Sequence, residues 1–562
     1  MNLAQMANSY RKNKQNPPLW GGETTQSQHL RVVCSGQRKD ITAKLIGVIS
    51  DKMRIYLNSM TRKTKLTLNT VSSLLYELTA IICGFILPRF FLTCYGSRVN
   101  GLVSSVTQFL GFITLAECGV GAVVQSTLYK PLADRDIIGI SKVVLSSERF
   151  FKRIAFILVG YTAILMVTYP FIAVDSFDYL YTLALIFVIS ISSFAQYYWG
   201  MTYRLLLNAD QLGFIQYTVS IFALVLNTVS CVILMRHGAS IHIVKLTTSL
   251  IFIIQPVLLS TIAKHRYSID RNIKLTEEPI KQKWNGVAQH ISSVVLGNTD
   301  IVVLTILSSL ENVSIYAVYN LIVNGVKQIV VSLTNGLRAL FGNMLAKDEE
   351  DALNDVFDCV EWLLHTLVTF VFSLTAFLIV PFVSVYTKNI TDANYLVPTF
   401  GYLITLAQAA YCLRLPYILL VNAAGHFKQT QASAIIEAII NIVISVILVF
   451  RFGLIGVAIG TFAAMTYRTV YLFNYLRKNI LFRRLFPFLK QILVDICEAV
   501  IFYLIVNSFP DFFMIHQANY VSWIILAFRS VGTAITIFVL VNGTLYSKRI
   551  KKFFCLLKTR RV

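Results

Sequence analysis

Between about residues 66 and 544 the chain repeats one pattern, in which a long apolar run is followed by a short polar connection. A helix that crosses the hydrocarbon core of a bilayer needs about 20 mostly apolar residues, and fourteen runs are roughly that long. We therefore expect an all-α, polytopic membrane protein with about 14 transmembrane helices. The expected spans are residues 66–92, 101–125, 152–174, 179–201, 213–235, 240–263, 285–307, 313–340, 356–383, 393–421, 430–450, 454–476, 489–508 and 519–544.

The composition agrees with a chain that lies mostly in lipid. Hydrophobic residues make up 56% of it and charged residues 14%, whereas soluble domains carry about 25% charged residues. The connections between the runs leave little room for a water-soluble catalytic domain, so we expect a protein that is not an enzyme and has no catalytic residues. The nine cysteines and eight histidines are dispersed without metal-ligand spacing, and we expect neither a metal nor a cofactor.

The net charge of +22 is interpreted as a signal for orientation in the membrane, and no nucleic-acid partner is expected. Basic residues concentrate at both ends of the chain and in alternate connections, at residues 126–153, 264–284 and 477–490. Because cytoplasmic loops are enriched in Lys and Arg, both termini are predicted to be cytoplasmic. Residues 1–65 are polar and basic, without the apolar core of a signal peptide. A start at Met60 would keep all the spans, so residues 1–59 are either a dispensable tail or precede the natural start.

An internal repeat relates the two halves of the apolar region. A shift of 214 residues places Tyr203, Asn208 and Asn227 on Tyr417, Asn422 and Asn441. The shift covers six spans, so both halves enter the membrane in the same orientation, and we expect two six-helix lobes that rock about a shared cavity. The expected parts are a basic cytoplasmic tail (1–65), an N-terminal lobe (66–263), a cytoplasmic linker (264–284), a C-terminal lobe (285–480), two additional helices (481–547) and a basic cytoplasmic C-terminus (548–562).

Cations inside the apolar spans are candidates for substrate binding, because a charge at the bilayer centre costs at least about 2.5–3.5 kcal/mol on insertion scales. The candidates for lining the cavity are Lys245, Lys327, Arg414 and Arg468. The alternative for each is a structural ion pair within a bundle.

Other charged residues in the spans have simpler interpretations. Arg89, Arg204 and Arg338 lie near span ends, where long side chains can extend to the interface. Glu361 and His365 are four residues apart on one helical face. A proton site is one interpretation of this pair, and a structural pair near the cytoplasmic end is the favoured one.

Polar residues in the spans complete the candidate set. Asn320 and Asn324 share the eighth span with Lys327 and are candidates for binding sugar hydroxyls in the cavity. The alternative is hydrogen bonding between helices, typically worth under about 2 kcal/mol per bond. Glu77 and Asp300 are the candidates for binding a coupling ion.

Several stretches of the sequence resemble the oligosaccharide flippases of the MOP superfamily, the Wzx-type polysaccharide exporters. They are Leu87–Gly101, Glu117–Gly121, Tyr129–Asp134, Gly297–Asp300 followed by Val302–Thr305, and Phe341–Lys347. The resemblance covers all fourteen predicted spans and leaves out residues 1–65.

The resemblance implies a function in the assembly of surface polysaccharide at the bacterial cytoplasmic membrane. The protein would move an oligosaccharide linked to undecaprenyl diphosphate from the inner to the outer leaflet by alternating access. Its partners would be the lipid-linked oligosaccharide, membrane lipid, and the polymerase and glycosyltransferases of the same assembly. Basic residues in the cavity would suit the diphosphate.

Two alternatives are retained. A cation-coupled multidrug exporter of the same superfamily would need acidic residues such as Glu77 and Asp300 in its cavity. A membrane polysaccharide polymerase or glycosyltransferase would need catalytic residues in an outer connection, where Asp175 and Asp178 form the one acidic pair.

Overall fold

The computed structural model describes residues 60–117, 119–172, 177–273, 287–334, 337–347, 349–515, 517–547 and 549–551. The chain divides into two compact units, Met1–Lys65 and Leu66–Val562, and the description below concerns the second. The predicted tail up to residue 59, Asp175, most of the predicted linker and most of the predicted C-terminal segment lie outside the described residues.

Every regular element in the described ranges is helical, which confirms the predicted all-α class. The elements are α3 (Arg62–Gly111), η1 (Phe112–Glu117), α4 (Val120–Ala133), α5 (Ile137–Ile172), α6 (Tyr179–Ala195), η2 (Gln196–Gly200), α7 (Met201–Ala209), α8 (Gly213–Arg236), α9 (Ile241–Arg266), α10 (Val287–Leu307), α11 (Leu310–Leu333), α12 (Leu337–Ala346), α13 (Glu350–Tyr386), α14 (Pro398–Leu413), α15 (Leu415–Ala423), α16 (Phe427–Phe452), α17 (Leu454–Asn479), α18 (Phe486–Ser508), α19 (Pro510–Phe513) and α20 (Tyr520–Leu545).

The protein is a multi-pass membrane protein. Eleven helical segments of the described chain are long and apolar enough to cross a membrane, and one of them, Thr64–Glu117, covers the first predicted span and most of the second. The predicted spans 454–476 and 489–508 fall on α17 and α18, which are helical but are not among the eleven. Both helices carry buried charged side chains, for example Arg468 in α17 and Glu498 in α18.

The outer surface is rich in large apolar side chains. Leu180, Phe450 and Phe528 expose 69%, 71% and 76% of their surface. Soluble monomeric proteins rarely expose large contiguous apolar patches, whereas lipid is a suitable solvent for such residues. The interior contains fully buried aromatic residues such as Tyr319 and Phe400, whose rings pack edge to face with centroids 5.2 Å apart.

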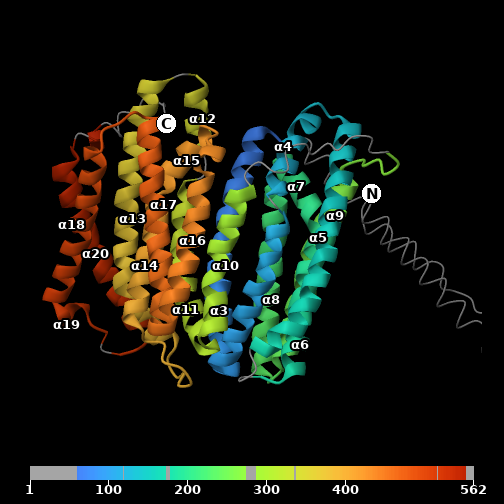
Figure 1. Cartoon of the computed structure of the whole chain (residues 1–562), viewed down its shortest axis with the longest axis horizontal. Coiled ribbons are helices and arrows are strands. Elements are labelled where there is room, and N and C mark those ends of the chain that lie inside the picture. The colour runs from blue at the N-terminus through green and yellow to red at the C-terminus, as the bar shows by residue number, and fades with distance from the viewer. Residues whose placement is uncertain are drawn as a thin grey trace, which may run out of the picture. The chain divides into compact units, whose positions relative to one another are not determined.

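The first predicted span and the beginning of the second form one helix, α3, which reverses its direction at Gly96. Gly96 has φ 80° and ψ 176°, a backbone conformation that residues with a Cβ rarely adopt. Helix α3 therefore has two limbs that run in opposite directions (Figure 1).

Packing between helices falls into two groups that follow the order of the chain. Helices α4 to α9 pack on one another, with α9 against α6, α7 and α8, and helices α10 to α17 pack on one another, with α17 against α14 and α16. Helix α10 also packs against η1 and so joins the groups. Helices α18 and α20 pack on α13 at the edge of the second group (Figure 1).

Candidate functional site

A polar cavity of about 580 Å³ lies between α3 and helices of the first group. Glu77 of α3, Arg204 of α7 and Gln255 of α9 contribute to its lining. Gln255 Nε2 donates a hydrogen bond to Ser220 Oγ over 2.6 Å. The structure therefore places the coupling-ion candidate Glu77 in a polar cavity, and it places Arg204 there rather than only at a membrane interface.

The shape of this polar cavity depends on an irregular turn between α6 and α7. Residues Gln196–Gly200 form a π-helical turn, a feature that occurs frequently at functional sites. A Cβ on Gly200 would lie 2.6 Å from Cβ of Pro256, so the absence of a side chain lets α9 approach this turn. Gln196, Gly200 and Pro256 all line the cavity.

Two further cavities are lined mainly by apolar side chains. One, of about 700 Å³, lies between α3, α11, α13 and α20, and the other, of about 490 Å³, lies between α13, α14 and α18. None of the four predicted substrate-binding cations lines any of the three cavities.

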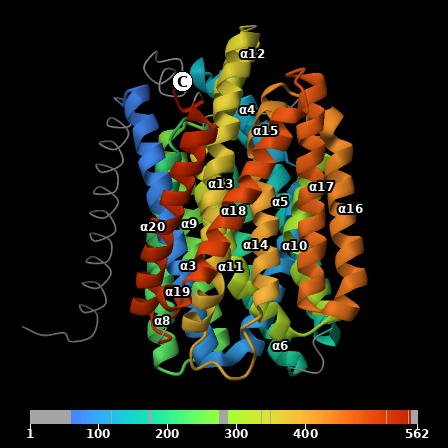
Figure 2. The same cartoon turned by 90° about the vertical axis from the view of Figure 1, so that its left-hand side faces the viewer.

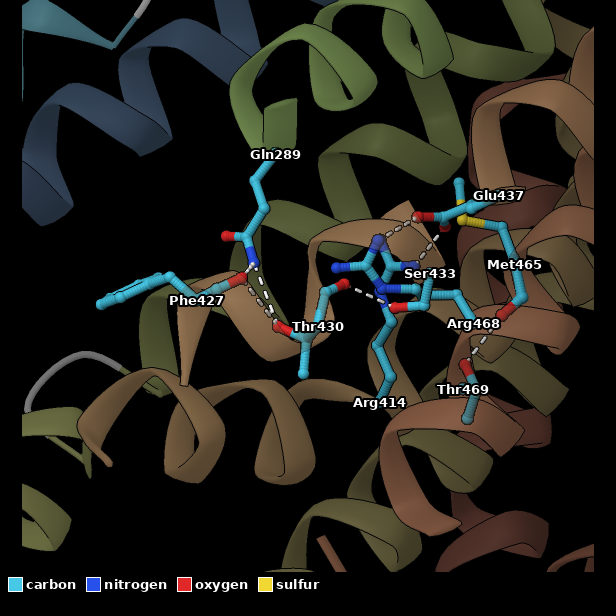
Figure 3. Close-up of polar contacts among 9 residues, drawn as sticks. All are labelled: Gln289, Arg414, Phe427, Thr430, Ser433, Glu437, Met465, Arg468 and Thr469. Atoms are coloured by element: carbon cyan, nitrogen blue, oxygen red, sulfur yellow. Dashed lines mark hydrogen bonds and ion pairs between the residues drawn. The ribbon is translucent and has the colours of Figure 1, made fainter. Parts of the chain in front are cut away.

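Three of the four predicted cations instead gather in one cluster within the second group of helices. Arg414 Nη1 donates to Glu437 Oε1, and Arg468 Nη1 donates to Glu437 Oε2 over 3.3 Å (Figure 3). Lys327 Nζ and the Arg414 guanidinium lie 5.0 Å and 4.2 Å from the centroid of the Tyr411 ring. We call Lys327, Tyr411, Arg414, Glu437 and Arg468 the cation cluster.

Four helical elements bring the cation cluster together. Lys327 lies on α11, Glu437 on α16 and Arg468 on α17. Arg414 lies at the break between α14 and α15, two residues before Pro416, which cannot donate a backbone hydrogen bond. This break places the Arg414 guanidinium between Tyr411 and Glu437.

The cation cluster carries more positive than negative formal charge. Arg414, Arg468 and Glu437 are buried, and Nε of Arg468 has no hydrogen-bond partner among the described residues. One carboxylate thus serves two guanidinium groups, and the nearby Lys327 has a cation–π contact with Tyr411. Desolvated cations that are incompletely paired favour the approach of an anion.

The remaining substrate-binding candidates lie apart from the three clustered cations. Lys245 belongs to α9, in the first group of helices, and its Nζ lies 4.4 Å from the centroid of the Phe91 ring. Asn320 and Asn324 are half-buried on α11, the helix that carries Lys327. The structure therefore brings Lys327, Arg414 and Arg468 together and leaves Lys245 elsewhere.

Asp300, the second coupling-ion candidate, is buried in a cage of neutral polar groups. Its Oδ2 accepts hydrogen bonds from Tyr316 OH over 2.9 Å and from Thr461 Oγ1 over 2.7 Å, and its Oδ1 accepts from Asn441 Nδ2 over 3.2 Å. Within the described ranges no Lys, Arg or His pairs with Asp300. The amide oxygen Oδ1 of Asn441 is buried and has no hydrogen-bond partner among these residues.

The cage around Asp300 has the composition of a small cation site. Carboxylate, amide and hydroxyl oxygens are the ligands that hard cations prefer, and a buried carboxylate without a cation is costly. The sequence repeat identified Asn441 by its match to Asn227 but gave no indication that it faces Asp300. Tyr316 and Thr461 were not identified from the sequence.

A set of polar contacts joins α3 to the second group of helices at one end of the molecule. Ser97 donates to Asp392 from its backbone N over 2.6 Å and from Oγ over 2.7 Å, and Asn100 Nδ2 donates to Ser314 Oγ over 2.8 Å. Tyr395 OH donates to Ser97 Oγ over 2.7 Å. We call Ser97, Asn100, Ser314, Asp392 and Tyr395 the polar seal.

Neighbouring contacts strengthen the polar seal. Burial, together with the smaller effect of nearby carboxylates, raises the pKa of Tyr395, so its phenol remains a donor at neutral pH. Arg89 donates to the carbonyl oxygens of Tyr386 and Lys388, the latter over 2.8 Å. Sequence reasoning assigned Arg89 to the interface and gave no sign of these contacts, because its partners lie about 300 residues away along the chain.

The close approach of α3 and α11 at the polar seal requires a glycine. A Cβ on Gly101 would lie 1.9 Å from the carbonyl oxygen of Leu310. We expect Gly101→Ala to destabilise the protein by about 1–3 kcal/mol, because the helices must move apart. Thermal unfolding in detergent would measure this effect. The control is Gly160→Ala in α5, where a Cβ would meet no atom within 4 Å; equal melting temperatures for the two variants would contradict the expectation.

Comparisons with known proteins identify the fold. No family model and no curated protein matches the sequence. A solved structure titled "Lipid II flippase MurJ, inward closed conformation" superposes with a TM-score of 0.63 at 13% identity, covering 86% of this chain and 100% of that chain. An inward-facing multidrug resistance MATE family transporter of the MOP superfamily superposes with a TM-score of 0.53 at 14% identity, covering 72% of this chain and 94% of that chain.

An outward-facing structure of a multidrug resistance MATE family transporter gives a TM-score of 0.51 at 14% identity, over 75% of this chain and 97% of that chain. At these identities the likeness shows the fold alone. The chain therefore has the fold of MOP-superfamily transporters.

Proposed function

We propose that this protein is a flippase that moves a lipid-linked oligosaccharide, carried on undecaprenyl diphosphate, from the inner to the outer leaflet for surface polysaccharide assembly. The observation that carries the proposal is the cation cluster, in which Arg414 and Arg468 share the Glu437 carboxylate and Lys327 lies over the adjacent Tyr411 ring, inside a membrane protein. The fold that the chain shares with a lipid II flippase supports a lipid-linked substrate.

A diphosphate is the anion that best suits the cation cluster. Guanidinium groups bind phosphate oxygens with paired, charge-assisted hydrogen bonds, whereas Lys binds phosphate as a point charge. Asn320 and Asn324 lie on the helix of Lys327 and offer amide groups for sugar hydroxyls. A membrane potential that is negative inside would favour export of an anion by about 2.3 kcal/mol per charge per 100 mV.

Glu437 has a specific role in this mechanism. In the absence of substrate its carboxylate binds Arg414 and Arg468 and keeps both guanidinium groups in place. An arriving diphosphate replaces Glu437 as their partner. Glu437 thus keeps the buried cations paired in the resting protein, and the site can still accept a dianion when the substrate arrives.

Alternating access is supported by the division into two helix groups. In the proposed mechanism the predicted lobes 66–263 and 285–480 each contain one of these groups, and the polar seal joins α3 to the second group where the connections carry few basic residues. By the positive-inside rule that end faces outward and both termini are cytoplasmic. In this arrangement the polar seal is the outer gate, and it is closed.

The outer gate makes a testable prediction. We expect Asp392→Ala to open it, because the variant cannot accept the two hydrogen bonds from Ser97, and each bond to a charged group is worth about 1.5–3 kcal/mol. The measurement is labelling of a thiol introduced by Thr305→Cys with a membrane-impermeant maleimide. Thr305 is buried, and its Oγ1 lies 2.6 Å from Oγ of Ser105, which is on the same limb of α3 as Ser97 and Asn100. The rate should rise at least about tenfold.

A matched control tests whether the loss of any carboxylate at this end has the same effect. Asp511→Ala removes an exposed carboxylate of α19, for which no contact with the polar seal is found among the described residues. Its labelling rate should equal that of the parent. Equal labelling rates for the Asp392 and Asp511 variants would contradict the assignment of the polar seal as the outer gate.

We assign the binding of a coupling ion, whose gradient would drive transport, to Asp300. Its cage supplies carboxylate and hydroxyl oxygens, and the unpartnered Asn441 Oδ1 is an additional ligand. The polar cavity around Glu77 is the second candidate. A monovalent cation or a proton would neutralise either carboxylate.

A cation-coupled multidrug exporter is the second candidate function. Glu77 in a polar cavity of about 580 Å³ favours it, as does the fold shared with multidrug resistance MATE transporters. The two functions differ in the charge of the substrate. An exporter of cationic drugs would use Glu77, and its activity would not require the cation cluster.

Deletion of the protein from its native cell tests the proposed function. We expect a lipid-linked oligosaccharide to accumulate on the inner leaflet and surface polysaccharide to be lost. Increased drug sensitivity with normal polysaccharide would support the exporter instead. Loss of lipid-linked intermediates together with polysaccharide would indicate a glycosyltransferase, and accumulation of single repeats on the outer leaflet would indicate a polymerase.

A further inference from the structure

A buried hydrogen-bonded chain connects α13, α15 and α18, away from the cation cluster. His365 Nδ1 lies 2.7 Å from Asp495 Oδ2, and His365 Nε2 lies 2.8 Å from Tyr417 OH. Tyr417 OH donates to Glu361 Oε1 over 2.9 Å. The sequence placed Glu361 and His365 on one helical face, and the structure joins them through Tyr417. Figure 2 shows α13 beside α18 and α20.

One end of this chain approaches the protein surface. Glu361 Oε2 lies 3.8 Å from Arg483 Nη1, which also donates to Asp358 Oδ1 over 2.7 Å. The Asp358 side chain is 38% exposed. Asp358 and Arg483 therefore connect Glu361 to water. They lie at the end of the molecule that the positive-inside rule assigns to the cytoplasm.

The other end of the hydrogen-bonded chain is Asp495, and next to it on α18 is a carboxyl group with an unfilled hydrogen-bonding position. Glu498 lies three residues after Asp495, on the same face of α18. Its Oε1 accepts from Asn542 Nδ2 over 2.6 Å, while Oε2 has no partner among the described residues. Only 1% of Glu498 is exposed. Within the described ranges no Lys, Arg or His forms an ion pair with it.

The chain can hold one proton at three successive groups without any heavy atom moving. With the proton on Glu361, Tyr417 accepts from Glu361 and donates to His365. With the proton on His365, both ring nitrogens donate, one to Tyr417 and the other to Asp495. With the proton on Asp495, this residue donates to Nδ1. Each transfer breaks one O–H or N–H bond and forms another, so atoms and charge balance.

We propose that Glu498 is a proton-binding site and that Glu361, Tyr417, His365 and Asp495 relay protons to it from the cytoplasm. The final transfer passes the proton from Asp495 to Glu498, one helical turn away. Overall, cytoplasmic water loses one proton and the Glu498 carboxylate becomes a carboxylic acid. Its free Oε2 accepts that proton.

The surroundings of Glu498 on each packed element agree with this assignment. Asp495 on the same helix is a like charge, and Asn542 on α20 is neutral and also accepts from Trp362 Nε1 over 2.8 Å. Tyr546, after the end of α20, is a neutral phenol. The nearby cations Arg549 and Lys490 contact groups other than Glu498. Arg549 donates a hydrogen bond to Gln491 over 3.3 Å, and Lys490 lies over the Tyr546 ring. Two adjacent carboxyl groups without a shared cation favour retention of a proton.

A purely structural role predicts a different result for one conservative variant. Polar contacts between membrane helices hold them together, and Gln at position 498 could still accept from Asn542. Glu498→Gln thus keeps the contact between α18 and α20 and removes the titratable group. A structural role would leave every proton-dependent signal unchanged.

The test is infrared difference spectroscopy of the purified full chain in lipid nanodiscs, titrated with acid and base. We expect wild type to show a protonated-carboxyl C=O band that is lost at alkaline pH and is missing in Glu498→Gln. Glu437→Gln, at a buried carboxyl with two arginine partners, is the control and should keep the band. Identical band patterns in wild type and Glu498→Gln at every pH would overturn the site.

The relay is tested separately by a pH jump. Tyr417→Phe removes the hydroxyl between Glu361 and His365, so the band should reach the same final size but form at least about tenfold more slowly. Unchanged kinetics would overturn the relay.

Asp495→Asn provides a second test of the site if Glu498→Gln does not fold. Removal of the neighbouring negative charge should make the Glu498 band disappear at a lower pH than in wild type. A band that titrates as in wild type would overturn the assignment. These readouts do not involve transport, so they stand or fall independently of the proposed substrate.

Discussion

Arg414→Ala is expected to abolish transport of the lipid-linked oligosaccharide while the protein remains in the membrane. Arg414 supplies a buried guanidinium that is proposed to bind the diphosphate. Hydrogen bonds to charged groups are worth about 1.5–3 kcal/mol, so the rate should fall about 10- to 100-fold for each hydrogen bond to the diphosphate that the variant cannot make. The measurement is surface polysaccharide in a deletion strain that carries the variant, with membrane protein quantified in parallel.

The single Arg414 variant also weakens the pairing of Glu437, which can destabilise the protein by about 3–5 kcal/mol. The triple variant Arg414→Met, Glu437→Leu, Arg468→Met separates the two effects, because it removes the carboxylate together with both guanidinium groups that pair with it and leaves none of the three buried charges without its partner. We expect the triple variant to be more stable than Arg414→Ala but not to regain transport. Recovery of polysaccharide in the triple variant would show that Arg414 and Arg468 serve only as structural partners of Glu437.

Lys327→Ala is the matched control within the same cluster. Lys327 contacts the Tyr411 ring, and no carboxylate is paired with it in the described chain. Lys327→Ala leaves no carboxylate without its ion-pair partner. The stability of the protein should therefore change little, while the rate of transport falls. Normal polysaccharide in both Lys327→Ala and the triple variant would show that the cation cluster takes no part in transport.

Asp300→Asn is expected to eliminate coupling to an ion. Asn is nearly the same size as Asp and can still accept from Thr461, but it lacks the negative charge that attracts a cation. We expect transport in proteoliposomes to fall at least about tenfold and to lose its dependence on a sodium or proton gradient. The comparison of rates with and without each gradient identifies the ion.

Glu77→Gln is the companion variant for the coupling experiment. Glu77 is the other acidic candidate and lies in the separate polar cavity. If Asp300 binds the coupling ion, Glu77→Gln should retain the gradient dependence. Loss of that dependence in Glu77→Gln but not in Asp300→Asn would transfer the coupling site to the polar cavity.

The helical fold could be predicted because its signal is local. An apolar run of sufficient length predicts a membrane helix whatever its partners are, and the described predicted spans fall on helices. The reversal at Gly96 within one helix was not predicted, since a positive φ at glycine leaves no pattern in the neighbouring residues. The π-helical turn that brings Arg204 to the polar cavity was not predicted either, because it has no recognisable pattern in the sequence.

The candidate site could be predicted only as a set of residue types. Buried charges are rare enough in a span to identify Arg414 and Arg468, but their common partner Glu437 lies 23 and 31 residues away on another helix. Rotation of each helix about its axis decides such contacts, and the sequence of one chain does not specify it. For the same reason Lys245 was grouped with the other cations, although the structure places it over Phe91.

Translocation in proteoliposomes tests the central claim, that the cation cluster carries an anionic lipid-linked sugar across the membrane. Two glycolipids with the same polyprenyl chain and sugar would be compared, one with a diphosphate and one with a neutral linkage. We predict that wild type moves the diphosphate lipid, that an inside-negative potential accelerates its export, and that Lys327→Ala moves it far more slowly. Equal rates for the charged and neutral lipids, or full activity of Lys327→Ala, would contradict the account.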